Sequence, residues 1–285
     1  MDKTVAFIMR NSRPLDFLLW EHAQGRPRRD QVLEVLATYQ NDDGGFARAI
    51  EPDNFSPHST PMGTWKATTV LRQIDCFDSG VPLVARAIDY LTATRLPDGY
   101  WSATDPATNA FPHAEWWDDT GPEHRRWGIN PTAGLLGYLL RAGADVAHDV
   151  NDLVERYVDG PPVTMTELPL ALTLHDDLRS VALPVPQGFV ERLASDIDAV
   201  LERDPARWSD YVVRPSTLFN GRNADLAAPY ADLIAGEKRY LMATMDSDGS
   251  WEPNWHWKEH PSEWAVARNW WKAILAREYL GFLAP

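Results

Sequence analysis

Apolar residues recur every three to four positions over most of the chain, which is the spacing of an amphipathic α-helix. Sustained alternation of apolar and polar residues, the pattern of a strand, is nearly absent. The pattern therefore predicts an all-α fold. The expected helices cover residues 14–23, 29–40, 61–75, 81–94, 131–142, 146–158, 163–178, 187–203, 226–244 and 262–283, with a weaker signal at 211–221.

Several helix ends can be predicted from the flanking residues. Pro131 suits a first helical position with Asn130 as its cap, and Ser262 suits an N-cap. The His-Asp-Asp sequence at 175–177 closes a predicted helix, so we expect a solvated helix end there.

Three segments share one form, in which an amphipathic helix leads through a polar Asp-Gly turn to an aromatic residue. Glycine permits the turn that ends the helix, and aspartate caps nearby backbone N–H groups. The aromatic side chain is expected to fold back between neighbouring helices. The segments are QVLEVLATYQNDDGGF (31–46), ARAIDYLTATRLPDGYW (85–101) and GEKRYLMATMDSDGSW (236–251), and weaker copies lie at 153–163 and 199–208.

A second repeat follows the first, because the tripeptide Trp-Lys-Ala occurs at 65–67 and again at 271–273. Each unit is then an outer helix, a turn, a variable loop and an apolar inner helix. At roughly 45–60 residues per unit, the chain holds five to six helical hairpins. We therefore predict one domain, residues 1–285, folded as an (α/α)5-6 toroid that the last helix closes on the first hairpin.

These repeats resemble the QW motif of squalene–hopene-type cyclases. The sequence from Gln40 to Phe46, QNDDGGF, matches that motif best, whereas Arg95 and Met245 replace the Gln in the other copies. The stretch GGF…PHSTPMGTWKATTVL also looks like prenyltransferase β-subunits. The resemblance implies the toroid of terpenoid cyclases and protein prenyltransferases, with His58 at the mouth of a central cavity.

The catalytic motifs of those families are missing from this chain. It has no Asp-x-Asp-Asp acid, and Cys76 lacks the spacing to Asp and His that the prenyltransferase zinc site needs. The acidic string at 118–123 lies in a Pro/Gly loop rather than on a helix. No cofactor and no metal ligand is therefore predicted, and a divalent metal stays possible without a motif to support it.

Charge and composition narrow the choice of partner. The net charge is −14 with no basic stripe, which argues against nucleic acid and anionic membranes. No apolar run reaches the length of a membrane span. The single cysteine and the lack of a recognisable signal peptide predict a cytoplasmic protein. The 13 Trp residues suit either a lined apolar or sugar-binding cavity or wedges in the core; the oligomeric state stays open.

Three polar loops that lead from outer to inner helices should approach the cavity mouth. The first, 47–61, carries Glu51, Asp53 and His58, which suit acid–base work, although Asp53 could equally cap a turn. The second, 102–129, suits either a lid over an apolar ligand or a packed surface loop. In the third loop, 251–264, Trp255 and Trp257 alternate with His256, so the two indole rings should share one face of an extended stretch.

We expect an enzyme, a terpenoid cyclase-like lyase, isomerase or transferase, that acts on an apolar, isoprenoid-like small molecule in a Trp-lined cavity. Glu51 and Asp53 would be the acid and base, with His58 and His113 as partners. The alternatives are a carbohydrate-active (α/α)6 barrel, lyase or hydrolase, and a non-catalytic ligand-binding toroid. The residues expected to bind substrate are Trp65, Trp116, Trp117, Asp118, Trp255 and His256.

Overall fold

The computed structural model describes residues 2–220 and 223–284, and every regular element in these ranges is a helix. Extended residues in the same ranges pair only through isolated bridges. The predicted all-α class is confirmed. Residues 1 and 285 of the predicted domain, and residue 221 of the weakest predicted helix, lie outside the described residues.

The longer helices occur in pairs that are joined by loops of very different length. Short 3-10 helices lie within several of the loops. In chain order the α-helices are α1 (Asp2–Asn11), α2 (Pro14–Ala23), α3 (Arg29–Ala37), α4 (Pro61–Gln73), α5 (Pro82–Thr94), α6 (Thr132–Arg141), α7 (Ala147–Asp159), α8 (Leu168–Ser180), α9 (Gln187–Val200), α10 (Pro215–Leu218), α11 (Ala224–Ala227), α12 (Ala231–Thr244) and α13 (Pro261–Leu283).

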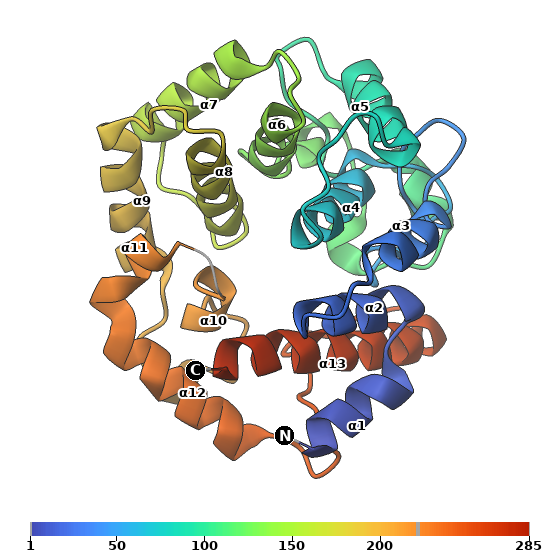
Figure 1. Ribbon diagram of the computed structural model, residues 1–285, viewed down its shortest axis with the longest axis vertical. Coiled ribbons are helices and arrows are strands. Elements are labelled where there is room, and N and C mark those ends of the chain that lie inside the picture. The colour runs from blue at the N-terminus through green and yellow to red at the C-terminus, as the bar shows by residue number, and fades with distance from the viewer. Residues whose placement is uncertain (1, 221–222, 285) are drawn as a thin grey trace.

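The helices form two layers around a central axis, as Figure 1 shows. Helices α2, α4, α6, α8, α10 and α13 lie inside, and α1, α3, α5, α7, α9 and α12 lie outside. Along the inner layer α13 contacts α2, α2 contacts α4, and the contacts continue through α6 and α8 to α10. Each inner helix also packs on an outer one, α1 against α13 and α12 against α10 among them.

The three Asp-Gly turns have the same geometry. In the last of them Asp248 Oδ1 accepts a hydrogen bond from the backbone N–H of Ser250 at 3.0 Å, and Gly249 has a φ of 91°. Equivalent bonds to Asp43 and Asp98 are 3.0 and 3.2 Å long. The aspartate caps the turn and the glycine takes the left-handed conformation, as the repeat predicts.

The aromatic residue after each turn folds back onto its own outer helix. Trp101 Nε1 donates to the carbonyl of Leu91, and Trp251 Nε1 donates to the carbonyl of Leu241, both at 2.9 Å. Phe46 is fully buried in the corresponding place without an N–H to donate. The predicted wedge is therefore a real part of the packing.

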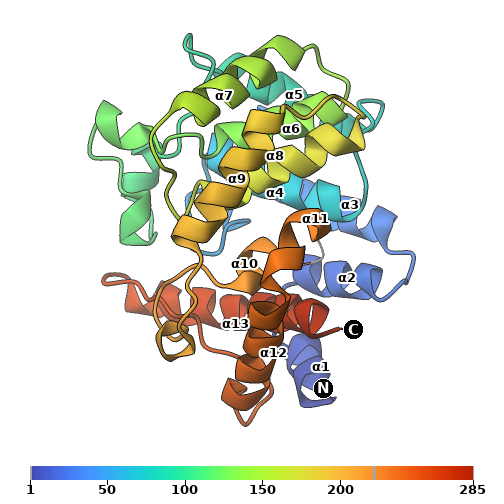
Figure 2. The same ribbon diagram turned by 90° about the vertical axis from the view of Figure 1, so that its left-hand side faces the viewer.

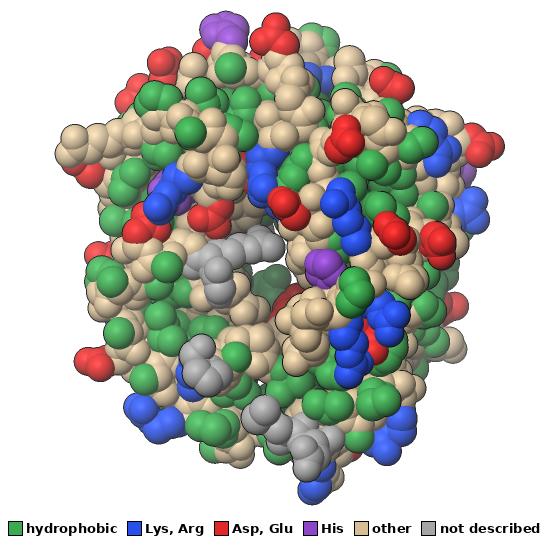
Figure 3. All heavy atoms as spheres, in the orientation of Figure 1, with side chains coloured by type: hydrophobic (Ala, Val, Ile, Leu, Met, Phe, Trp, Pro, Cys, Tyr) green, Lys and Arg blue, Asp and Glu red, His purple; other side chains and the backbone are tan. Residues whose placement is uncertain are grey.

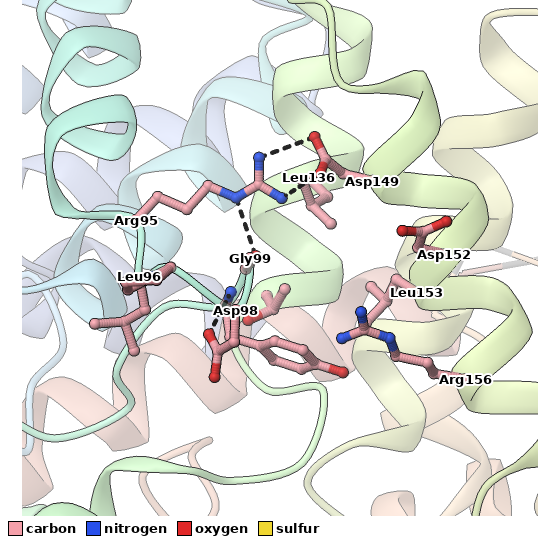
Figure 4. Close-up of a pocket in the computed structure, with 12 residues that line it drawn as sticks. Arg95, Leu96, Asp98, Gly99, Leu136, Asp149, Asp152, Leu153 and Arg156 are labelled. Atoms are coloured by element: carbon pink, nitrogen blue, oxygen red, sulfur yellow. Dashed lines mark hydrogen bonds and ion pairs between the residues drawn. The ribbon is translucent and has the colours of Figure 1, made fainter.

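The residue at the Gln position of each repeat joins one hairpin to the next. Gln40 Nε2 donates to the carbonyl of Leu83 in the first turn of α5 at 2.9 Å. Arg95 reaches Asp149 in the first turn of α7 at 2.7 Å, while its Nε donates to the carbonyl of Gly99, as Figure 4 shows. The longer Arg side chain spans a groove of about 380 Å³ between this turn and α7.

The third copy makes the same connection across the two ends of the chain. Met245 Sδ accepts a hydrogen bond from Thr4 Oγ1 of α1 at 3.4 Å. The neighbouring turn lies so close to α1 that a Cβ on Gly249 would lie 2.5 Å from the backbone carbonyl carbon of Lys3. Helix α1, which the periodicity did not predict, therefore follows α12 in the outer layer.

Two helix boundaries differ from the predictions because of proline. Helix α8 begins at Leu168 rather than 163, so that Pro169 lies in the first turn, where its missing N–H is harmless. The predicted helix 226–244 is divided by a 3-10 turn at Ala228–Tyr230, which contains Pro229.

Two predicted caps are wrong for the same reason. Pro261 opens α13, so the cap position falls on His260 and Ser262 lies inside the helix. Helix α6 begins at Thr132, and Pro131 rather than Asn130 stands at its cap position. Among the described residues no helix is both long enough and apolar enough to cross a membrane.

Candidate functional site

The three long loops meet at one end of the molecule. Figure 2 shows the segment between α5 and α6 and the start of α13 projecting on the same side. The N–H of Ala114 donates to the carbonyl of Asp53 at 3.0 Å, and Lys258 Nζ lies 3.3 Å from the Glu115 carboxylate. Trp257 Nε1 donates to Asp53 Oδ1 at 2.8 Å. All three loops therefore contribute to one structure.

Asp53 lies at the centre of this structure. Its side chain is buried, and Oδ1 accepts hydrogen bonds from the indole N–H groups of both Trp257 and Trp271 at 2.8 Å. Burial, followed by the nearby negative charge of Glu51, raises the pKa of Asp53 to about 7, although the two indoles and Lys66 act in the opposite direction.

The two oxygens of Asp53 have different environments. Both indole bonds end on Oδ1, and no described residue donates a hydrogen bond to Oδ2. In the neutral acid the proton therefore belongs on Oδ2, since Oδ1 already accepts two N–H groups. This leaves a carboxylic acid whose proton is available at neutral pH.

Glu51 lies on the same loop as Asp53 but has a different environment. Its Oε2 forms an ion pair with Lys66 Nζ of α4 at 3.2 Å. The ammonium group of Lys66 also lies 5.2 Å from the centre of the Trp271 ring. One loop thus carries an Asp53 carboxyl group with a raised pKa and a Glu51 side chain that is paired with Lys66, and two carboxyl groups in such different environments are typical of acid–base sites.

Aromatic rings surround the two carboxyl groups. Trp271 makes an edge contact with Trp255 at 5.1 Å, and Trp255 makes another with Tyr211 at 6.2 Å. On the other side Phe55 packs edge-on against Trp257 at 5.9 Å. Faces of this kind stabilise positive charge that develops beside them.

His113 does not contact either carboxyl group through its side chain. Its Nε2 lies 2.8 Å from the exposed Asp118 carboxylate, and its Nδ1 bonds to the carbonyl of Phe111. The backbone of His113 forms a bridge with Asn54. The structure thus places His113 and Asp118 in a brace between loops, which joins the first loop to the second.

His58 lies at the surface and lines a cavity of about 10 Å³ together with Glu51 and Trp117. Its ring packs edge-on against Phe111 at 5.4 Å. Of the four residues predicted as acid, base or partner, Glu51, Asp53 and His58 therefore lie near one another.

The tryptophans that were predicted to bind substrate lie in different parts of the structure. Trp65 wedges α4 against α6, since a Cβ on Gly134 would lie 2.4 Å from its Nε1. Trp116 packs, half-buried, in the cluster of loop aromatics. Trp255 and the exposed His256 line an open pocket of about 300 Å³.

Four residues of the site were not among the predicted site residues, namely Lys66, Tyr211, Trp257 and Trp271. For two of them a signal was present, because Lys66 and Trp271 belong to the repeated Trp-Lys-Ala tripeptide. Tyr211 has no such marker, because it lies in an irregular loop before α10.

The expected solvated helix end at 175–177 is wrong. His175 and Asp177 are almost fully buried, and Asp177 forms an ion pair with Arg72 of α4 at 2.6 Å.

A pocket of about 590 Å³ lies at the end of the molecule opposite the three loops, and Arg72, Arg141 and Arg179 line it. Figure 3 shows this end, with a hollow at the centre and charged side chains around it.

Within residues 2–220 and 223–284 no group of three or more His, Cys, Asp or Glu side chains is arranged to hold a metal ion. In comparisons with known proteins, no family model, no curated protein and no solved structure matches the chain.

Proposed function

We propose that the chain is an (α/α) toroid enzyme, similar to terpenoid cyclases and protein prenyltransferases, in which Asp53 is the general acid. The two concentric helix layers and the three matching turns support the toroid. The buried free thiol of Cys76 is compatible with a cytoplasmic location. The proposed substrate is a small molecule with an apolar, isoprenoid-like body.

The observation that carries the proposal is the environment of Asp53. A carboxyl group with a pKa of about 7 carries its proton on about half of the molecules at neutral pH, where an ordinary aspartate is almost fully ionised. The two indole bonds on Oδ1 fix the plane of the group, so that the proton on Oδ2 has a defined direction.

The proposed reaction moves one proton out and one back. Asp53 Oδ2 donates its proton to an oxygen or an alkene carbon of the substrate, and positive charge develops on the substrate. The neighbouring faces of Trp255 and Trp271 and the carboxylate of Glu51 stabilise that charge. An adjacent substrate carbon then loses a proton to solvent and the Asp53 carboxylate regains one from solvent, so the net change is isomerisation or cyclisation.

The test compares the wild-type protein with Asp53→Asn on prenyl diphosphates, linear polyenes and their epoxides, with mass spectrometry of the products. We expect product from the wild type and a loss of about 100-fold or more in the variant. Asp89→Asn, which changes an exposed carboxylate of α5 outside the three loops, is the matched control. Equal activity of Asp53→Asn and wild type would exclude Asp53 as the acid.

A second candidate is a carbohydrate-active enzyme of the (α/α)6 type. The observation in its favour is that the indole N–H groups of Trp117 and Trp255 are buried without an acceptor among the described residues. Such groups suit the hydroxyl oxygens of a sugar better than a hydrocarbon. Release of reducing ends from an oligosaccharide panel, with no product from the polyenes, would favour this function.

A further inference from the structure

The cavity beside Glu51 has the size and the lining of a site for one water molecule. Its volume is about 10 Å³, close to the minimum that one water needs. Polar side chains from the first loop, Glu51, Ser56 and His58, line it together with Trp117 from the second loop.

Trp117 supplies an independent sign that a small polar molecule belongs here. Its side chain is 7% exposed, and its Nε1 is buried without an acceptor among the described residues. The ring is stacked on Trp127 at 5.4 Å. A buried N–H without an acceptor costs roughly 1–3 kcal/mol, so an acceptor in the cavity is favoured.

His58 lies between this cavity and bulk solvent. The residue is exposed, and its backbone N–H donates to Ser56 Oγ at 3.2 Å. The edge contact with Phe111 limits where the ring can turn. One side of the imidazole is thus open to solvent while the residue also lines the cavity.

We propose that a single water in this cavity, held between Trp117, Glu51 and His58, is the path by which protons from solvent reach Asp53. The proposal rests on the function proposed for Asp53. One ring nitrogen of His58 takes a proton from solvent, and the other nitrogen gives its proton to the water. The water passes one of its protons to the Glu51 carboxylate, which passes it to Asp53 Oδ2. One proton enters, one arrives, and no electrons are transferred.

The charges around the path favour delivery to Asp53. Lys66 of α4 pairs with Glu51 and stabilises its charged form between transfers. Other titratable groups that interact with Glu51 or Asp53 include Arg13, just before α2, and Tyr211, before α10. Burial raises the pKa of Asp53 to about 7, so its carboxyl group is a suitable end point for the proton.

The experiment is a laser-triggered pH jump on the intact protein, followed by tryptophan fluorescence, because two indoles bond directly to Asp53. The wild type should show a relaxation that Asp53→Asn lacks. In His58→Ala we expect the same amplitude but a relaxation rate that is lower by roughly tenfold or more. Added imidazole should restore the rate. His148→Ala, which removes an exposed histidine outside the cavity, should keep the wild-type rate.

The outcomes separate the relay from the proposed function. An unchanged rate in His58→Ala, or a lowered rate that imidazole does not restore, would overturn the relay while leaving Asp53 as the acid. If the wild type relaxed like Asp53→Asn, Asp53 would not be the group that titrates, and the proposed function itself would fail. A high-resolution crystal structure should show an ordered water within hydrogen-bonding distance of Trp117 Nε1, and Trp117→Phe should lose it. Absence of that water from the wild type would also overturn the relay.

Discussion

Asp53 binds its proton more firmly than an ordinary aspartate because burial and the nearby charge of Glu51 outweigh the two indole donors and Lys66. Removal from water raises the pKa, and two N–H donors on Oδ1 only partly offset this. The folded protein therefore binds a proton that the unfolded chain, with an ordinary aspartate, has released. Between about pH 4 and pH 7 the stability of the fold falls as the pH rises, and above that range this contribution is constant.

Asp53→Asn should therefore be more stable than the wild type at pH 8 and similar to it at pH 4. Asparagine keeps an Oδ1 that can accept both indole bonds, and it never ionises. A shift of about three units corresponds to an upper limit on the order of 4 kcal/mol at pH 8. Urea unfolding at both pH values measures the difference. An equal difference between the two proteins at pH 4 and at pH 8 would contradict the assignment.

The carboxyl groups of the site could be predicted from the sequence, but the indoles that bind Asp53 could not. Glu51 and Asp53 could be chosen from the sequence because they stand in a polar loop that leads into an inner helix. The indoles that hold Asp53 come from residues 257 and 271, more than 200 positions away. Only the tertiary fold brings them together, and no local pattern encodes that contact.

At the scale of the elements, two of the three repeated aromatic residues, Trp101 and Trp251, each donate one hydrogen bond to their own outer helix. Trp101→Phe removes the bond to the Leu91 carbonyl but keeps most of the ring, so we expect a loss of about 1 kcal/mol in the free energy of unfolding. Trp65→Phe is the matched control, because its buried N–H has no acceptor among the described residues. Urea unfolding should show little or no loss for Trp65→Phe. Equal losses would mean that ring volume rather than the hydrogen bond matters.

The periodicity predicted most helices well, and α2 begins and ends at the predicted residues 14 and 23. It failed where another constraint was stronger than the apolar pattern. Pro169 delayed the start of α8, and Pro261 moved the start of α13. The buried Asp177 was predicted to be solvated because its partner, Arg72, lies 105 residues away.

At the scale of the whole molecule, the two ends of the chain meet. Helix α1 packs on α13, and Met245 accepts a hydrogen bond from Thr4. The repeat predicted that the last helix would close on the first hairpin. It did not predict α1 itself, although α2, a helix of the same length, was predicted. The Asp-Gly turn before α13 is where this contact is tightest.

Gly249→Ala should therefore destabilise the whole molecule more than an equivalent change elsewhere. Gly25 is the matched control, because it also has a positive φ, 79°, but an added Cβ there would meet nothing within 4 Å. Both substitutions strain the backbone by roughly 1–2 kcal/mol. Only Gly249→Ala also pushes a methyl group against the backbone of α1, so its loss in the free energy of unfolding should exceed that of Gly25→Ala by about 1–3 kcal/mol. Hydrogen exchange should report faster opening of α1 in Gly249→Ala than in Gly25→Ala. If Gly249→Ala and Gly25→Ala had equal free energies of unfolding and equal hydrogen exchange in α1, the contact between the two ends of the chain would not stabilise the fold.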